Sequence, residues 1–411
     1  MHRRLATGGV ALCAAVALTL TACGSKSTSG GGGEASGGSG SAAATGLTIT
    51  PLAQIDTSGK EVPTSDAGQA VLPSALGNAP CPATNIAMAG ALTGDNSALG
   101  INIRNGAQLA VNQHNAANPN CKITLKSFDT EGDPQKATQV APTITGDQSI
   151  IGLIGPAFSG ETKATGSIFA QAGLVATTAS ATNPDLAKNG WRTFYRGLAN
   201  DAVQGPAVAK YMAGKLGYKR VCVIKDDSDY GVGLAKTITE GLGSAHDASC
   251  DADVKSKERD FSAVINKLSQ AKPDAIFYSG YYAEAAPLVT QMRQQGLQTV
   301  FVSGDGTNDP NFVSQAGQSA KDAYLSCPCG PAKDPFKGDY TKAFNMAPGV
   351  YSVEAYDLAT ILMKGIEEGK RTRPELLDYV KNYSGQGLAR HYQWNAQGEL
   401  TSALIWIYQV K

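Results

Sequence analysis

Histidine is scarce in this sequence, and neither sign of charge is in excess. Only four of the 411 residues are histidine, so side chains for acid-base catalysis are few. The G-x-S-x-G, H-E-x-x-H and Walker P-loop motifs are absent, as is a G-x-G-x-x-G that opens a helix after a strand. The 35 basic and 35 acidic residues balance, with no basic cluster and interleaved aromatics. The sequence therefore predicts no enzyme, no cofactor and no nucleic-acid partner.

Long apolar runs are also missing, except at the N-terminus. A basic start at 2–4 precedes an apolar run at 10–21, which is too short for a permanent membrane helix and is typical of an export signal. The run ends in L-T-A-C, which resembles the lipobox of bacterial lipoproteins. We therefore expect a signal peptide over 1–22 and a lipid on Cys23, with an ordinary signal peptide as the alternative. The lipid is then the only expected membrane anchor.

The stretch after the cysteine has nothing to bury. Residues 23–46 are almost wholly Gly, Ser, Ala and Thr after Cys23, which predicts a flexible tether with a reach of roughly 25 to 30 Å. At 47–80, the residues 47–52 suit an edge strand, but the Pro, Ser and Asp that follow favour irregular chain. About 330 residues remain from 81 to 411, more than one core usually supports, so two domains are expected.

Six cysteines remain for the exported domain once Cys13 in the signal and Cys23 are set aside. An even number outside the cytoplasm predicts disulfides. Cys81 and Cys121 each lie just before a predicted strand, with a helix-length segment between them, and Cys222 and Cys250 bracket a second βαβ unit in much the same way. The remaining Cys327 and Cys329 form either a tight local disulfide or a pair of thiols. A C-x-C without a nearby histidine is weak evidence for zinc, so no metal site is predicted.

Short apolar strands alternate with amphipathic helices in both halves of the domain. The predicted strands are 85–88, 123–128, 150–155 and 174–178 in the first half, and 221–225, 252–254, 275–278 and 299–302 in the second. Helices such as 232–242 and 261–270 lie between them. This spacing predicts an α/β fold with parallel sheets covered on both faces. Ligands bind beyond the carboxyl ends of such strands, so functional residues are expected there.

A series of motifs from about residue 85 to 409 carries a family resemblance. In order, they are Gly90-Ala91-Leu92-Thr93-Gly94, Asn105-Gly106-Ala107, Phe128-Asp129, Asp133-Pro134, Ile154-Gly155 leading to Ser159, Ala181-Thr182-Asn183-Pro184, Asp229-Tyr230-Gly231, 257–261, Gly280-Tyr281-Tyr282 and Tyr356-Asp357. Their order and spacing together resemble the Leu/Ile/Val-binding family of type I periplasmic binding proteins.

The resemblance implies two Rossmann-like α/β lobes joined by three crossing segments, near residues 200, 328 and 388. It assigns 81–200 and 329–388 to lobe 1, and 201–328 and 389–411 to lobe 2. A small ligand is expected in the cleft between the lobes. The family further implies that the ligand is passed to the permease subunits of an ABC importer, from the outer face of the cell membrane.

The first lobe is expected to bind a ligand carboxylate. Ser159 opens a helix just after a strand, so its hydroxyl and the free N–H groups of the first turn point at one place that suits an anion. Ser180, Ala181 and Thr182 follow the next strand. By resemblance, Ser159 and Thr182 hold the carboxylate and the backbone of Ser180 meets the amino group. Taken singly, each of these residues suits a helix cap or a turn equally well.

The second lobe offers Tyr230, Tyr281 and Asp305 to the same cleft. Asp305 lies just past a predicted strand, where an acidic side chain pairs well with an ammonium group. The amino-acid binders of the family usually have glutamate here, so this side chain is one methylene shorter. The alternative is an Asx turn between Gly304 and Gly306.

Carboxylate donors on one wall and an acid on the other fit a zwitterion, of which an α-amino acid is the simplest. For its side chain, Leu99 stands where the family often has an aromatic residue, and Phe158, Tyr230 and Tyr351 are further lining candidates, although each suits the core equally well. A branched-chain or otherwise apolar amino acid is therefore expected. The alternatives are amides, urea-like compounds or aromatic acids as ligands, or a sensor ectodomain that binds the same ligand.

Overall fold

The computed structural model describes residues 46–64, 69–77 and 79–411. The predicted signal peptide at 1–22, the lipidated Cys23 and the tether up to residue 45 lie outside the described residues. Within the described part, the two predicted α/β lobes are present, and each is built on its own sheet.

The first lobe has a five-stranded parallel sheet in the order β4-β3-β5-β6-β7. Its strands are β3 (Thr84–Gly90), β4 (Ile123–Asp129), β5 (Ile150–Ile154), β6 (Val175–Thr178) and β7 (Phe194–Arg196). Its helices are α1 (Ser97–Ala117), α2 (Pro134–Gly146), α3 (Ser159–Gln171), α9 (Phe336–Phe344), α10 (Ser352–Glu367) and α11 (Arg373–Lys381). Because all five strands run the same way, their carboxyl ends lie along one edge.

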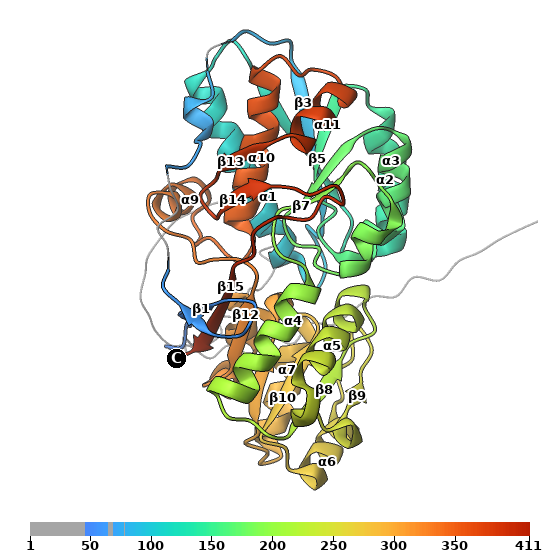
Figure 1. The fold of residues 1–411 in the computed structure, drawn as a ribbon, viewed down its shortest axis with the longest axis vertical. Coiled ribbons are helices and arrows are strands. Elements are labelled where there is room, and N and C mark those ends of the chain that lie inside the picture. Colours follow the sequence, from blue (N-terminus) through green and yellow to red (C-terminus); the bar gives the residue numbers. More distant parts are fainter. Residues whose placement is uncertain (1–45, 65–68, 78) are drawn as a thin grey trace, which may run out of the picture. The chain divides into compact units, whose positions relative to one another are not determined.

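The second lobe has an eight-stranded sheet in the order β2-β1-β15-β12-β11-β10-β8-β9. Its strands are β1 (Ile49–Ile55), β2 (Glu61–Val62), β8 (Val221–Lys225), β9 (Ala252–Asp253), β10 (Ala275–Ser279), β11 (Val300–Ser303), β12 (Tyr324–Cys327) and β15 (Ile405–Val410). Its helices are α4 (Asp201–Lys210), α5 (Asp229–Leu242), α6 (Ser262–Ala271), α7 (Tyr282–Gln294) and α8 (Pro310–Ala316). Figure 1 shows β3, β5, α10 and α11 together in one lobe, and β8, β10, α5 and α6 together in the other.

Local sequence explains where these elements begin and end. The eight predicted strands are all present and end within two residues of the predicted bounds. Most are buried apolar runs, whereas β4 is only half buried and β9 has two residues, neither of them buried. The carboxylate of Asp133 caps α2 by accepting hydrogen bonds from the N–H groups of Gln135 and Lys136, at 2.7 and 3.0 Å. In the same way, the hydroxyl of Ser228 accepts the N–H of Gly231 at the start of α5.

The N-terminal stretch 47–80 is more regular than predicted. Residues 49–55 form β1, which pairs antiparallel with β15, so the prediction of irregular chain is wrong for this part. The register of the pair shifts between Pro51 and Ala53, and a proline is tolerated at such a bulge because it has no N–H to donate. The sequence indicated only part of this strand, as an edge strand at 47–52, because its partner lies about 350 residues further along the chain.

The third crossing lies later than the resemblance implied. Residues 391–400, which include β14 (His391–Gln393), bind to lobe 1 rather than lobe 2. β14 pairs with β13 (Ser384–Gln386), and the indole of Trp394 donates to the carbonyl of Arg196 at 2.6 Å. The backbone of Arg196 in turn donates to the carbonyl of Gly398. The return to lobe 2 therefore lies between Leu400 and Ile405, not at 388.

All three cysteine pairs form disulfides. Cys81 is bonded to Cys121 and Cys222 to Cys250, each joining the starts of two neighbouring parallel strands as predicted. Cys327 is bonded to Cys329, so the local disulfide is confirmed and the pair of free thiols is not found.

Candidate functional site

The N-terminus of α3 lies at the carboxyl edge of the first sheet. Glu161, in the first turn of the helix, offsets part of the positive charge at this helix end. The carboxylate of Glu161 accepts the N–H of Phe158 at 2.8 Å and the hydroxyl of Thr130. Burial raises the pKa of Glu161 to about 7. The hydroxyl of Ser159 is buried and accepts the N–H of Asn183 at 3.2 Å. The first-turn N–H groups of α3 have no partner within the helix, so they remain able to bind an anion.

The loop after β6 is tied firmly in place beside Ser159. The hydroxyl of Ser180 donates to the carbonyl of Ala157, and the N–H of Ala181 donates to the hydroxyl of Thr178 at 3.0 Å. The Thr182 hydroxyl is buried beside the carboxyl group of Asp201, whose backbone N–H donates to the carbonyl of Thr182 at 2.9 Å. The structure therefore brings Ser159 and the loop 180–182 together.

Three aromatic rings pack against one another, tilted, across the two lobes. The ring of Phe158, in lobe 1, lies 4.7 Å from that of Tyr281, in lobe 2, measured between ring centroids. The ring of Tyr281 lies 5.1 Å from that of Tyr230. Tyr281 directly precedes α7, and Tyr230 is in the first turn of α5. These three predicted lining residues form one apolar wall.

Asp305 is fully buried and hydrogen bonded to side chains from three other elements. One carboxylate oxygen accepts from the Gln204 amide at 3.0 Å and from the Tyr230 hydroxyl at 3.1 Å. The other oxygen accepts from the Tyr351 hydroxyl at 2.6 Å. Burial raises the pKa of Asp305, and these hydrogen bonds oppose the rise. The alternative of a simple Asx turn is wrong, because the carboxylate bonds to distant side chains.

Tyr351 holds a strained backbone at this point. It directly precedes α10 and has φ +69°, in the left-handed region that residues with a side chain rarely occupy. Such a conformation costs about 1 to 3 kcal/mol and clusters at functional sites. Because α10 packs along α1 in lobe 1, the hydrogen bond from Tyr351 to Asp305 also joins the lobes.

Further polar contacts join the lobes at the surface around the site. The ammonium of Lys163 lies 2.7 Å from the carboxylate of Asp229, and the amide of Asn183 donates to the backbone carbonyl of the same residue at 2.6 Å. The amide of Asn102 donates to Asp309 at 3.1 Å. The lobes are therefore in contact, and Asp305 lies buried between them.

Known proteins resemble this chain over most of its length. A family model described as periplasmic binding protein matches residues 83–411. The chain belongs to this family. A leucine-, isoleucine-, valine-, threonine- and alanine-binding protein of Pseudomonas aeruginosa is 30% identical over 300 residues, which cover 71% of this chain and 79% of that protein.

Solved structures of other binding proteins have the same fold as this chain. The isoleucine-bound substrate-binding protein of a branched-chain amino acid transporter from Streptococcus pneumoniae aligns with a TM-score of 0.74 and 27% identity, over 79% of this chain and 95% of that one. A benzoate-bound solute-binding protein of R. palustris aligns with a TM-score of 0.72 over 80% of this chain and 94% of that one, at 16% identity. The latter likeness concerns the fold alone.

Leu99 is a predicted lining residue that lies outside the aromatic wall of Phe158, Tyr230 and Tyr281. It is fully buried in α1 and belongs to the same apolar core cluster as Phe158 and Tyr351. Its contact with a ligand side chain stays a prediction, as do the ligand contacts of the other site residues.

Two residues of this site, Asp201 and Gln204, were not predicted from the sequence. Both lie in the first turn of α4, directly after β7, and both are fully buried. The Gln204 amide donates to Asp305 and also to the Ser326 hydroxyl, at 3.1 Å. Like the predicted residues, they follow the carboxyl end of a strand. This strand, β7, is only three residues long and was not recognised.

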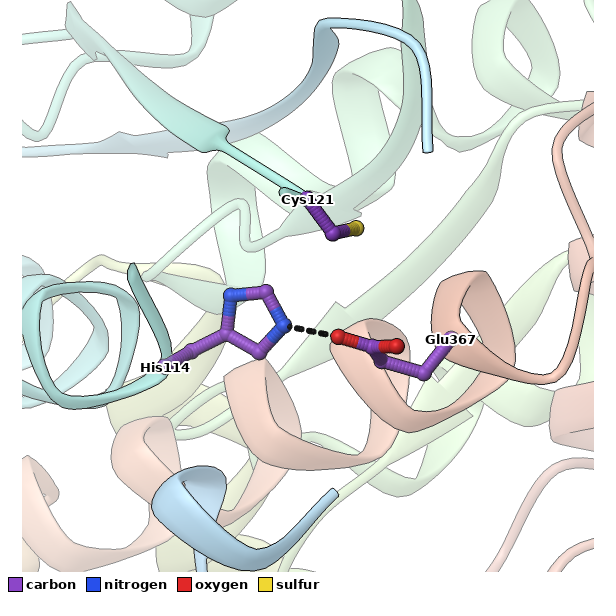
Figure 2. Close-up of side chains that lie close together, drawn as sticks. All are labelled: His114, Cys121 and Glu367. Atoms are coloured by element: carbon purple, nitrogen blue, oxygen red, sulfur yellow. Dashed lines mark hydrogen bonds and ion pairs between the residues drawn. The ribbon is translucent and has the colours of Figure 1, made fainter. Parts of the chain in front are cut away.

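A cluster of His114, Cys121 and Glu367 has the residue types of a metal site, and Figure 2 shows the three side chains facing one another. The imidazole Nε2 lies 2.7 Å from the carboxylate of Glu367, and the amide of Asn118 donates to the same oxygen. The sulfur of Cys121 is bonded to Cys81, so it offers no thiolate. The cluster therefore ties α1 to α10 rather than presenting three metal ligands.

Proposed function

We propose that this protein binds a branched-chain or otherwise apolar L-amino acid between its lobes and delivers it to the permease subunits of an ABC importer. The observation that carries the proposal is the buried Asp305 on one side of the site, with the N-terminus of α3 and the Thr182 hydroxyl on the other. An acid suits the ammonium of a zwitterion, and N–H and hydroxyl donors suit its carboxylate. The amino acids named for the relatives from Pseudomonas and Streptococcus support this class. Binding without catalysis is part of the proposal.

A thermal-shift screen tests the ligand class. A ligand at 100 times its Kd stabilises the fold by about 2.7 kcal/mol, which is visible as a higher melting temperature. We expect L-leucine, L-isoleucine or L-valine to raise the melting temperature, and 4-methylpentanoic acid, which is leucine without its ammonium, to leave it unchanged. Benzoate and urea serve as further controls. If benzoate raises the melting temperature and no amino acid does, the ligand is an aromatic acid.

We further propose that the protein is held at the outer face of the cell membrane by a lipid on Cys23. The L-T-A-C sequence at 20–23 supports this anchor. Among the described residues, no helix is long and apolar enough to cross a membrane.

Replacing Cys23 by alanine tests the anchor. The wild-type chain is expected to partition into the detergent phase of a Triton X-114 extraction, because an acyl chain stabilises membrane association by about 0.8 kcal/mol per buried CH₂. The Cys23→Ala chain should lose the acyl group and be retained with its signal or shed into the medium. Cys13→Ala, within the predicted signal, is the matched control. Detergent partitioning that is the same for wild type and Cys23→Ala, with the signal cleaved from both chains, rules the lipobox out.

A further inference from the structure

The Cys81–Cys121 disulfide is more accessible than the other two. Cys81 is partly exposed, whereas the other five bonded cysteines are buried: Cys121, Cys222, Cys250, Cys327 and Cys329. Thiol–disulfide exchange requires that a thiolate reach one of the two sulfurs, so its rate depends on access. A dithiol in the surrounding medium should therefore reduce Cys81–Cys121 before either of the other bonds.

Reduction of this bond leaves two thiols beside His114 and Glu367. One donor atom each from His114, Cys121 and Glu367 lies within 4.8 Å of the other two, and all three residues are buried. Figure 2 shows how these side chains face one another. The Cys81 sulfur is bonded to that of Cys121, so it lies at the same place. Two thiolates, an imidazole and a carboxylate are together a donor set that zinc binds in four-coordinate sites.

The spacing of the donors is close to that of a zinc site. Zinc lies about 2.3 Å from sulfur and about 2.0 to 2.2 Å from nitrogen and oxygen, so the donors of a tetrahedral site are about 3.5 Å apart. Donor atoms up to 4.8 Å apart therefore need to approach by about 1 Å. Breaking the S–S bond frees both cysteine side chains to rotate, which allows this approach.

Two helices end at this cluster, and their ends favour a cation. His114 is in the last turn of α1, and Glu367 is the last residue of α10. The C-terminus of a helix carries a partial negative charge. In addition, Oε2 of Glu367 is buried and accepts no hydrogen bond from the described residues. A metal ion at this position offsets the negative charge and binds the free oxygen.

Two asparagines hold the imidazole and the carboxylate in place. Nδ1 of His114 lies 3.3 Å from Oδ1 of Asn115, which accepts the Nδ1 proton when Nε2 binds a metal. The Asn118 amide donates to Oε1 of Glu367 and to the carbonyl of Ala79, and so leaves Oε2 free. Zinc between Nε2 and Oε2 therefore replaces the direct contact between Nε2 and Oε1, which are 2.7 Å apart.

We propose that reduction of Cys81–Cys121 turns this cluster into a zinc site, with the two thiolates, Nε2 of His114 and Oε2 of Glu367 as its ligands. The dithiol transfers two electrons and two protons to the S–S bond and is itself oxidised to a disulfide. Zinc then displaces the two thiol protons, which pass to the solvent. Re-formation of the Cys81–Cys121 bond by a disulfide oxidant reverses both steps and releases the metal.

The zinc site is separate from the proposed ligand site. Cys81 and Cys121 lie just before β3 and β4, at the edge of the first sheet opposite to the one that carries Ser159 and Thr182. Zinc holds the starts of the two strands together as the disulfide does, and adds the ends of α1 and α10. It is therefore expected to stabilise the reduced chain and to leave leucine binding unchanged.

A second disulfide of the chain provides a matched control. His246 and Asp251, whose Nε2 and carboxylate are 2.7 Å apart, flank Cys250 in the sequence. Within the part of the chain that the structure describes, however, only the cluster of His114, Cys121 and Glu367 brings three such donors within 4.8 Å of one another. Residue types alone would thus predict zinc at both disulfides, and the geometry predicts it at one.

Zinc binding by the reduced protein tests the site. A phosphine reduces the disulfide, since a dithiol would itself bind zinc, and is then removed in oxygen-free buffer. A thiol reagent should count two thiols in the folded chain. Equilibrium dialysis against Zn²⁺ should give one zinc ion per reduced chain and none for the oxidised chain. The reduced chain should also melt at a higher temperature with zinc, and lose this gain when EDTA is added.

Two variants distinguish this site from non-specific binding by free thiols. Loss of an outer-shell partner alone costs about 10- to 100-fold in metal affinity, so Glu367→Gln, which loses a ligand, should weaken zinc binding by at least about tenfold. His246→Gln should bind zinc as wild type does.

Zinc that does not bind to the reduced wild type overturns the proposal, and so does an affinity that is equal in Glu367→Gln and wild type. A loss in His246→Gln as large as that in Glu367→Gln overturns it as well. If Glu367→Gln does not fold, Co²⁺ added to the reduced wild type decides the question, because thiolate ligands give cobalt an intense charge-transfer band. Absence of that band overturns the site.

Discussion

Replacing Asp305 by asparagine is expected to lower the affinity for L-leucine by about two to four orders of magnitude. In the proposed complex, the site removes the ammonium of the ligand from water, and Asp305→Asn leaves that charge with a weaker partner. Breaking a buried charge pair costs roughly 3 to 5 kcal/mol, and 1.4 kcal/mol corresponds to a tenfold change in affinity. Isothermal calorimetry measures the loss.

Asp305→Asn is not expected to destabilise the ligand-free protein. Asp305 is fully buried and its pKa is raised, so its charge is a burden on folding that the Gln204, Tyr230 and Tyr351 hydrogen bonds only partly offset. Without ligand, the melting temperature of Asp305→Asn should therefore equal or exceed that of wild type. A residue that merely stabilises a turn would behave in the opposite way.

Ser159→Ala provides the scale for this comparison. In the proposed complex, it removes one hydrogen-bond donor to the ligand carboxylate, worth about 1.5 to 3 kcal/mol, and keeps the N–H groups of α3, so affinity should fall by about one to two orders of magnitude. The order of the two losses is the test. Leucine binding by Asp305→Asn within a few-fold of wild type would show that the ligand does not place its ammonium against this carboxylate.

The sequence predicted the fold wherever a strand is a compact apolar run. Strands such as Ile150–Ile154 and Ala275–Ser279 are buried throughout, so their composition alone identifies them. The half-exposed Ile49–Ile55 was anticipated only as an edge strand at 47–52 that was not preferred, since its pairing with Ile405–Val410 depends on a partner from the other end of the chain. The lobe boundary near 388 was wrong for a similar reason: Trp394 binds β7, about 200 residues earlier.

The candidate site was predictable where a residue follows a recognisable strand. Ser159, Thr182 and Asp305 each follow such a strand, and the structure brings Ser159 and Thr182 to one side of the site and Asp305 to the other. Asp201 and Gln204 follow the three-residue β7, which is too short to show a period, so they were missed. The left-handed backbone of Tyr351 was also missed, because it is set by tertiary contacts rather than by local propensity.

Arg196→Met is expected to cause the largest loss of stability in this lobe. The side chain of Arg196 is fully buried, donates to the carbonyls of Ala181 and Asn183, and binds both oxygens of Glu399 at 2.9 and 3.0 Å. Methionine has similar length but no donor, so a mostly buried carboxylate and two carbonyls lose their partner. Removing one member of a buried ion pair costs about 3 to 5 kcal/mol, which lowers the melting temperature by roughly 6 °C or more.

Arg196 also fixes the loop that carries Thr182, so Arg196→Met should weaken ligand binding as well. Arg196 binds the backbone on both sides of Thr182, and Glu399, which comes from the late stretch 391–400, holds the guanidinium in place. Arg196→Met should therefore bind L-leucine more weakly, at a temperature where it is still folded.

Glu399→Gln is the control, because it keeps one oxygen acceptor while removing the charge, and should lower the melting temperature less. If Arg196→Met melts within about 2 °C of wild type, the pair does not hold the loop, and the rigidity of residues 181–183 must come from the Thr178 and Ser159 hydroxyls, which accept the N–H groups of Ala181 and Asn183.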